Sequence, residues 1–299
     1  MITIAYINIW KEDPNDYYFT NFFKYYFNDI KIINYTDNPD ILISSINGNI
    51  NIIKNSKAKC KLFFYGENLN RFPPYNNEQL LIDTFDLIVG FKYNNLEQKQ
   101  IRFPLWLMYY KFYNYTPEKN LIDYIETKYK ENKQKENKKI SATLIARHDR
   151  EGQRTKIYNE IVSNKYCNIY CPGIFKNNTN TIGNTSDDKI NYISKSIYNI
   201  CPENSVFEGY YTEKIIQAFE GGTIPLYWAI DLPEKGLINE NKYCFCNINN
   251  PSELKTQINK AMTNPNYYLE GNVFTDDAPD IISNYYNTLI NNIKIKLLF

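Results

Sequence analysis

Residues 199–228 contain the pattern that most restricts how this chain can fold. An apolar run is followed by a polar loop, a helix that opens at Thr212, and a second apolar run at 223–228. Thr212 is a suitable N-cap, and Gly221 and Gly222 can take the left-handed conformation that ends a helix. This order predicts a strand, loop, helix and strand in an α/β sheet, where ligands bind in loops at the carboxyl ends of strands. Because a helix N-terminus favours anions, a phosphate-bearing ligand is expected at this loop.

Strands and helices are expected to alternate along the whole chain, which predicts parallel sheets covered by helices, an α/β fold. In the first part, the apolar patterns predict strands at 2–9, 40–45, 61–65 and 85–91, with helices at 16–28 and 78–84. In the second part, besides 199–228, they predict strands at 139–146 and 167–171, with helices at 155–163 and 252–262.

A change of composition to Lys, Glu and Asn near residues 117–139 indicates a solvated helix or linker between two domains. We therefore expect an N-terminal α/β domain at 1–125, a charged linker or helix at 126–139, a C-terminal α/β domain at 140–278 and a terminal amphipathic helix at 279–299. Only Lys294 and Lys296 lie on the polar side of this last helix, so packing against the body is favoured over a place on a membrane surface.

Charge and composition exclude several classes of protein. With 34 basic and 33 acidic residues, the net charge is +1, which provides no field to hold a nucleic acid. The six cysteines show neither a paired framework nor zinc spacing, and reduced core thiols are expected. The N-terminal residues lack the pattern of a secretory signal, and no run of about 18 apolar residues occurs. We expect a cytoplasmic protein whose contact with a membrane is at most peripheral, through the C-terminal helix.

A long motif without gaps lies within 199–228 and consists of Glu203-Asn204-Ser205, Tyr210, Thr212-Glu213-Lys214, Ile224-Pro225 and Tyr227-Trp228. In this motif the chain resembles the α-1,3-fucosyltransferases of glycosyltransferase family 10, in the soluble form found in bacteria and viruses. Gly90-Phe91 and residues 102–105 are similar to further family segments. Pro202 and Ala229 depart from the family pattern of Phe and Gly, and a Cβ where Gly is normal can block close backbone approach.

The resemblance implies a fold and a reaction. The implied architecture is GT-B, with two Rossmann-like domains facing across a cleft. The implied reaction is the transfer of L-fucose, with inversion, from GDP-β-L-fucose to a hydroxyl of a GlcNAc-containing acceptor in glycan biosynthesis. The first candidate for this hydroxyl is O3. No cofactor or metal is expected, because the chain lacks the Asp-x-Asp triplet that holds a divalent metal in many glycosyltransferases, and Asp187-Asp188 looks like a helix start.

Glu67 is the candidate general base. It directly follows a predicted buried strand, which places a carboxylate at the carboxyl end of that strand. The family has Gly-Glu-Asn at this place, matched by Gly66-Glu67-Asn68, and the resemblance implies that this Glu takes the proton of the acceptor hydroxyl. The alternative is a surface glutamate that caps the following loop.

Cations of the protein are expected to meet the charge of the leaving diphosphate. Lys214 lies in the first turn of the predicted helix, where its ammonium and the free N–H groups can bind phosphates together. Arg154 lies at the start of another helix, and its placement is similar to that of the family's phosphate-binding arginine. Arg147 and Arg150 can reach the same loop and are the competing candidates. The alternative for Lys214 is an exposed helix lysine.

Three more residues match donor-binding positions of the family. Glu213 resembles the residue that binds donor hydroxyls, with the ribose as first candidate, and it also suits the positive start of a helix. Asn204 and Tyr210 match further donor-side positions, although Tyr210 is also compatible with a core aromatic. The roles of Glu203 and of His148, the single histidine, stay open.

Two other functions compete with this prediction. One is a related transferase with another linkage, such as α-1,4, or another GDP-sugar, because Pro202 and Ala229 depart from the family. The other is a non-catalytic sugar-binding relative, which the presence of Glu67, Arg154 and Lys214 disfavours.

Overall fold

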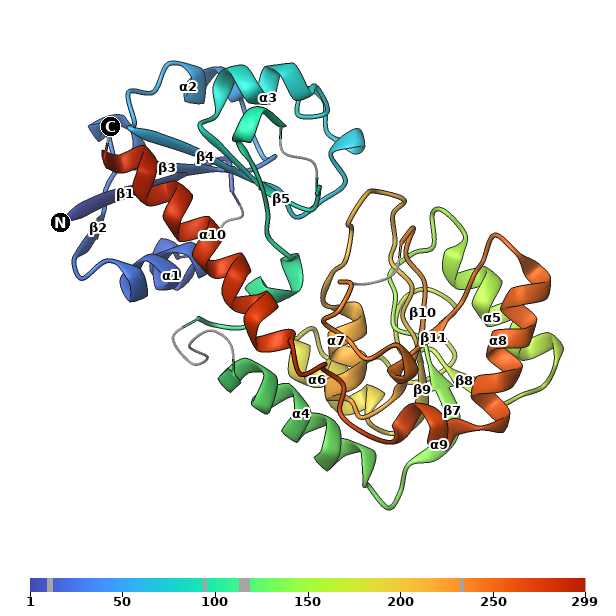
Figure 1. Cartoon of the computed structure of the whole chain (residues 1–299). Coiled ribbons are helices and arrows are strands. Elements are labelled where there is room, and N and C mark those ends of the chain that lie inside the picture. Colours follow the sequence, from blue (N-terminus) through green and yellow to red (C-terminus); the bar gives the residue numbers. More distant parts are fainter. Residues whose placement is uncertain (10–12, 94–95, 113–118, 232–233, 299) are drawn as a thin grey trace. The chain divides into compact units, whose positions relative to one another are not determined.

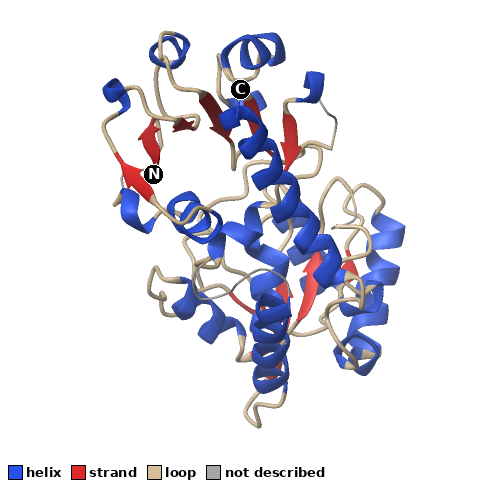
Figure 2. Cartoon of the chain, turned by 60° about the vertical axis from the view of Figure 1, so that its left-hand side comes forward, coloured by secondary structure: helices blue, strands red, loops and turns tan. Residues whose placement is uncertain are grey.

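The computed structural model describes residues 1–9, 13–93, 96–112, 119–231 and 234–298 and divides the chain into two compact units. Met1–Pro117, Phe207–Gly209 and Asp280–Phe299 form the first unit, and Glu118–Val206 with Tyr210–Pro279 form the second. Each unit contains one parallel sheet with helices around it (Figures 1 and 2). The predicted α/β fold class is confirmed.

The first unit is built on a six-stranded sheet in the order β2-β1-β3-β4-β5-β6, in which all pairs are parallel. Its strands are β1 (Ile2–Ile7), β2 (Ile30–Ile32), β3 (Ile41–Ser44), β4 (Cys60–Phe64), β5 (Leu87–Gly90) and β6 (Gln100–Arg102). Its helices are α1 (Tyr18–Tyr26), α2 (Ile50–Lys54), α3 (Glu78–Thr84) and most of α10 (Ala278–Leu298). Short 3₁₀ turns lie at Pro14–Asp16, Tyr35–Asp37, Leu69–Arg71, Leu96–Gln98 and Leu105–Tyr109.

The centre of the first sheet is apolar on both faces. Every residue of β3 and of β5 is buried, as expected for parallel strands with helices on either side. Helix α1 buries Phe19, Phe22 and Phe23 on one face. Aromatic residues at this spacing are typical of a helix with one buried face, and for this reason the sequence predicted the helix.

The second unit is built on a five-stranded parallel sheet in the order β11-β10-β9-β7-β8. Its strands are β7 (Lys139–Thr143), β8 (Asn168–Tyr170), β9 (Ser196–Ile200), β10 (Ile224–Tyr227) and β11 (Cys244–Phe245). Its helices are α4 (Lys119–Lys133), α5 (Gln153–Ser163), α6 (Ser186–Ile193), α7 (Glu213–Glu220), α8 (Pro251–Thr263) and α9 (Pro265–Leu269), with a 3₁₀ turn at Glu240–Lys242.

The charged segment around residues 117–139 divides differently from the expected linker at 126–139. Its first part is α4, which belongs to the second unit and buries Leu121, Ile125 and Tyr129 at a spacing of four residues. Charged residues lie between these positions, so the composition of the segment indicated a solvated helix although one face of it is apolar. The first unit accordingly ends at Pro117 rather than at residue 125.

The C-terminal helix α10 groups with the first unit, from which it is separated by the whole second unit in sequence. Its buried positions include Ile282, Tyr286, Leu289 and Ile293. Within the described residues, no helix combines the length and the apolar character needed to cross a membrane.

Each of the six cysteines is a free thiol, and all except Cys167 are buried, as predicted for reduced core residues.

Candidate functional site

Two loops of the second unit carry most of the predicted site. One follows β7 and leads into α5, and the other follows β9 and leads into α7 (Figure 1). Because β7 and β9 are parallel neighbours, both loops lie at the same edge of the sheet. The amide of Glu203 donates to the carbonyl of Trp228 (2.7 Å), which ties the second loop to the end of β10. Pro202 and Ala229, the two departures from the family pattern, are both buried here.

Arg154 is fixed in the first turn of α5. The carboxylate of Asp149 accepts from the amides of Arg154 (3.1 Å) and Thr155 (2.7 Å) and so caps the helix. The Arg154 guanidinium donates to the carbonyl of His148 (2.6 Å), and the residue as a whole is 8% exposed. Burial lowers the pKa of Arg154, and the nearby carboxylates of Asp149, Glu203 and Glu213 oppose this shift.

The competing arginines differ from Arg154 in their surroundings. Arg147 and Arg150 are exposed, whereas Arg154 lies within the electrostatic reach of Glu203, Tyr210 and Glu213. A largely buried cation next to these residues is better placed than an exposed one to bind an anion strongly. The contribution of His148 that the structure shows is its carbonyl, which holds Arg154.

Lys214 is held by a buried carboxylate. Its ammonium donates to Glu203 (2.8 Å) and to the hydroxyl of Thr212 (2.7 Å), and its side chain is 15% exposed. Burial favours the neutral amine, but the charges of Glu203 and Glu213 and the hydrogen bond with Glu203 outweigh it, so that the pKa of Lys214 is raised. Lys214 is therefore not the exposed helix lysine of the alternative interpretation.

Thr212 precedes α7, as predicted, but its side chain does not cap the helix. Its hydroxyl donates to the carboxylate of Glu203 (2.8 Å), and its amide donates to the same carboxylate (2.8 Å). Helix α7 ends at Glu220. Gly221, the C-cap, keeps the helical conformation, and Gly222, the next residue, is left-handed with a φ of +62°.

Glu213 pairs with a lysine that the sequence analysis did not single out. Lys189, in the first half of α6, lies 3.8 Å from its carboxylate. Helix α6 begins with a capping box of Thr185 and Asp188, so the helix start predicted at Asp187-Asp188 is confirmed.

The structure thus brings Arg154, Tyr210, Glu213 and Lys214 together in the second unit. Asn204 is half-buried in the same loop, next to Glu203. Tyr210 is 3% exposed, which agrees with a packed aromatic that borders the site. Cationic side chains beside a carboxylate suit a nucleoside diphosphate, because its phosphates attract cations and its ribose hydroxyls can donate to a carboxylate.

Glu67 lies in the first unit, whereas the other five predicted site residues lie in the second unit. It is half-buried and follows β4 after Tyr65 and Gly66. The next 3₁₀ turn is capped by Asn68, whose side chain accepts from the amide of Asn70 (3.0 Å). Asn68 is therefore a cap of this turn.

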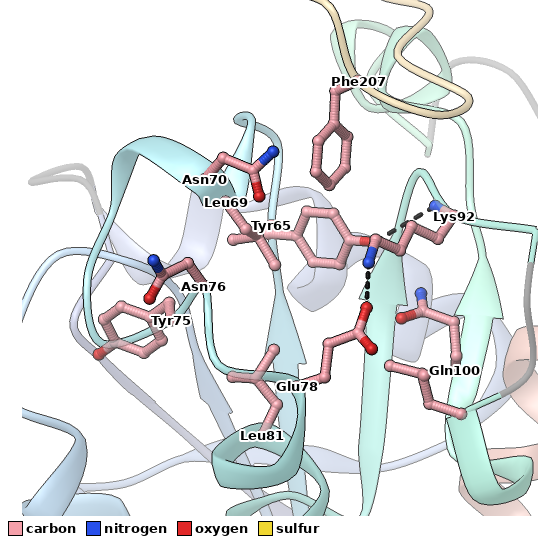
Figure 3. A pocket seen from close by; sticks show the side chains of 11 residues that line it. Tyr65, Leu69, Asn70, Tyr75, Asn76, Glu78, Leu81, Lys92, Gln100 and Phe207 are labelled. Carbon is pink, nitrogen blue, oxygen red and sulfur yellow. Dashed lines mark hydrogen bonds and ion pairs between the residues drawn. The ribbon is translucent and has the colours of Figure 1, made fainter.

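A pocket in the first unit lies close to this strand end (Figure 3). It encloses about 290 Å³ of space between atoms, part of it open to solvent. The ring of Tyr65 and the ring of Phe207 border it, and Lys92 forms an ion pair with Glu78 in its wall. Glu67 is not among the residues that line this pocket.

Two contacts of the first unit were missed by the sequence analysis. Phe207 sits in the middle of the family motif, yet its ring packs edge-on against Tyr65 (6.3 Å between centroids). The guanidinium of Arg102 donates to the carbonyls of Phe91 and Gly209 (3.3 Å to the latter). The φ of Gly209 is +64°, and a Cβ there would lie 2.3 Å from the carbonyl oxygen of Phe91. The available signal was the Gly within a run of large residues.

Within the part of the chain that the structure describes, no group of three or more His, Cys, Asp or Glu side chains is arranged to hold a metal ion.

Family models match both units. Residues 4–109 match the Alpha-(1,3)-fucosyltransferase FucT N-terminal domain, and residues 132–271 match the C-terminal model of glycosyltransferase family 10 (fucosyltransferase). Among curated proteins, the Alpha-(1,3)-fucosyltransferase FucT of Helicobacter pylori is 34% identical over 96 residues. That match covers 30% of this chain and spans 19% of the relative's length.

Solved structures agree with the family models in fold. A crystal structure of an alpha1,3-fucosyltransferase matches with a TM-score of 0.72 and 19% identity, covering 99% of this chain and 89% of that one. A structure of an alpha1,3-fucosyltransferase with GDP-fucose matches with a TM-score of 0.70 and 18% identity, covering 99% and 90%. The two parallel-sheet units are thus Rossmann-like domains of the GT-B type, as predicted. With both units matched, this chain belongs to glycosyltransferase family 10, the fucosyltransferase family.

Proposed function

We propose that this protein is a glycosyltransferase that moves L-fucose from GDP-β-L-fucose to a hydroxyl of a GlcNAc-containing acceptor, with O3 as the first candidate for that hydroxyl. The observation that carries the proposal is the pair of cations at the carboxyl ends of β7 and β9: the Arg154 guanidinium donates to the carbonyl of His148, and the Lys214 ammonium donates to the buried carboxylate of Glu203. Such fixed cations suit a diphosphate leaving group. The family models and the GDP-fucose complex of a relative of the same fold support this donor.

In the proposed mechanism, Glu67 takes the proton of the acceptor hydroxyl while that oxygen attacks C1 of fucose on the face opposite to GDP. The new glycosidic bond forms as the bond from C1 to the phosphate oxygen breaks, so the configuration at C1 is inverted. The electron pair leaves with GDP, and its charge is met by Lys214 and Arg154. No metal is needed for this step, because protein cations supply the charge.

Glu213 has a separate role in donor recognition. Its carboxylate accepts from hydroxyls of the donor, with the ribose as first candidate. Asn204 and Tyr210 complete the donor side. Lys189 lies 3.8 Å from the Glu213 carboxylate and so limits the positions that this carboxylate can take.

The proposal is tested by incubating the protein with GDP-fucose and GlcNAc, lactose or N-acetyllactosamine, with and without excess chelator, and measuring GDP release and product linkage. We expect transfer that chelator does not stop, and a loss of about 10²–10⁴-fold for Glu67→Gln, the usual contribution of a general base. Asp83→Asn, an exposed carboxylate of the same unit, is the matched control and should keep full activity.

The other outcomes separate the alternatives. Transfer from a different GDP-sugar, or to another hydroxyl, would identify a related transferase. Binding of GDP-fucose without release of GDP in the presence of any acceptor would indicate a sugar-binding protein. Full activity of Glu67→Gln would remove Glu67 from the mechanism.

A further inference from the structure

Glu203 is a fully buried carboxylate at the centre of the donor-side residues. It is 0% exposed, so it has no surface with which to touch a ligand. It accepts hydrogen bonds from the Thr212 amide (2.8 Å), the Thr212 hydroxyl (2.8 Å), the Lys214 ammonium (2.8 Å) and the Tyr227 hydroxyl (3.2 Å). Four donors from the helix start and from β10 therefore converge on one carboxylate.

This carboxylate determines where the Lys214 ammonium points. An ammonium has three N–H donors, and two of them are directed at Glu203 and at the Thr212 hydroxyl. Tetrahedral geometry then fixes the direction of the third. A lysine on an ordinary flexible side chain would lose more conformational entropy on binding an anion than one fixed in this way.

The same carboxylate also offsets the cost of burying a charge. An ammonium this enclosed would favour its neutral form without an opposite charge nearby. The charged groups that act on Lys214 are Glu203 from the loop after β9, Glu213 from α7, Arg154 from α5 and Lys189 from α6. Two of these four are positive, so the two carboxylates have to compensate for them.

We propose that Glu203 is a positioning residue which keeps Lys214 protonated and aimed at the donor diphosphate. The inference rests on the proposed function, in which Lys214 binds that diphosphate. It assigns to the first acidic residue of the family motif a role that does not require contact with either substrate. Two structural observations support this role: the Glu203 side chain is fully buried, and its carboxylate forms an ion pair directly with the Lys214 ammonium.

The test is GDP binding by isothermal titration calorimetry, for the wild type and Glu203→Gln, from about pH 7 to about pH 9. Glutamine keeps an oxygen that can accept from Thr212 but removes the negative charge, which lowers the pKa of Lys214. Above that pKa the amine is neutral, so the affinity of the variant for GDP should fall as the pH rises, by up to about tenfold per pH unit. The wild type should change much less, and comparison with it removes the effect of titrating GDP itself.

Two further variants separate charge from structure. In Glu203→Gln with Lys214→Arg, the guanidinium stays charged at every pH tested, so the pH dependence should disappear. Glu126→Gln is the matched control: Glu126 is another buried carboxylate of the same unit and accepts from the amides of Val273 (2.6 Å) and Phe274 (2.9 Å). We expect it to lower the melting temperature without adding pH dependence to GDP binding.

The outcomes distinguish the two proposals. A wild type that binds no GDP would overturn the proposed function. A wild type that binds GDP, with a Glu203→Gln variant of the same affinity and pH profile, would overturn the role of Glu203 alone. If Glu203→Gln does not fold, Glu203→Asp keeps the charge on a shorter side chain. It should weaken GDP binding with the wild-type pH profile, and a new pH dependence in that variant would contradict the inference.

Discussion

At the scale of single residues, Asp149 links the stability of a helix to the position of a cation. Its carboxylate bonds to two amides of the first turn of α5, where the preceding Gly152 has no side chain to do so. We expect Asp149→Ala to lower the free energy of unfolding by about 1–2 kcal/mol, as for the loss of a helix cap. GDP affinity should fall about tenfold, because Arg154 becomes less well fixed, equivalent to roughly 1.4 kcal/mol.

Chemical denaturation and GDP titration would check both effects. Asp149→Asn keeps an acceptor oxygen and should retain most of the stability. An Asp149→Ala variant that unfolds like the wild type would show that the two hydrogen bonds are not needed to start the helix.

The sequence suggested which residues to place at the candidate site, but it did not predict their hydrogen-bond partners. Lys214 and Arg154 could be proposed because a cation in a first helical turn has a clear chemical use. Thr212 was read as a cap, since it precedes a helix, yet its hydroxyl bonds to Glu203. Which acceptor a hydroxyl chooses depends on groups that only the folded chain brings near, and here a buried carboxylate competes successfully with the helix amides.

At the scale of elements, the junction of α4 and α7 depends on a close backbone contact. Gly222 has a φ of +62°, and a Cβ there would lie 2.2 Å from the amide nitrogen of Lys133. The ammonium of Lys138 donates to the carbonyls of Gly221 (2.9 Å) and Gly222 (2.6 Å) at the same place. A side chain at position 222 would therefore have to displace main-chain atoms.

We expect Gly222→Ala to destabilise the protein by more than about 2 kcal/mol, since the left-handed conformation alone costs about 1–2 kcal/mol for a residue with a Cβ. Gly271→Ala is the matched control. Its φ is +80°, but no atom lies within 4 Å of the added Cβ, so only the conformational cost should appear. Urea denaturation of both variants measures the difference, and equal losses would show that the α4–α7 contact can relax.

Long elements were predicted more reliably than short ones. The helix at 78–84 agrees with α3, and most other expected elements differ from the observed ones by a few residues at their ends. The strands β2, β6 and β11 were missed, because two or three residues carry too little periodicity. Each of them lies at an edge of its sheet and pairs with one neighbouring strand. They therefore form because of a tertiary contact and not because of their local sequence.

At the scale of the whole molecule, sequence order and structural grouping differ. The two sheets follow the expected order along the chain, since each is assembled from successive strand and helix units. The C-terminal helix and residues Phe207–Gly209 group with the first unit instead. Apolar periodicity shows that α10 must cover something but does not say which unit it covers.

Tyr286 of α10 gives this grouping a measurable consequence. Its ring lies 5.2 Å from that of Phe112, 5.8 Å from that of Phe103 and 6.2 Å from that of Phe22, measured between centroids. Removing a ring from such a buried cluster costs about 3–5 kcal/mol. We therefore expect Tyr286→Ala to destabilise the first unit, although position 286 follows the second unit in sequence.

Hydrogen exchange would locate this effect. Protection of amides in β3, β4 and β5 should fall in Tyr286→Ala, while those of β7, β9 and β10 stay protected and GDP binding persists. Asn284→Ala, an exposed position on the same helix, should leave both sheets unchanged. Loss of protection in both sheets together would mean that the units unfold as one cooperative body, and the assignment of α10 to the first unit would then have no energetic meaning.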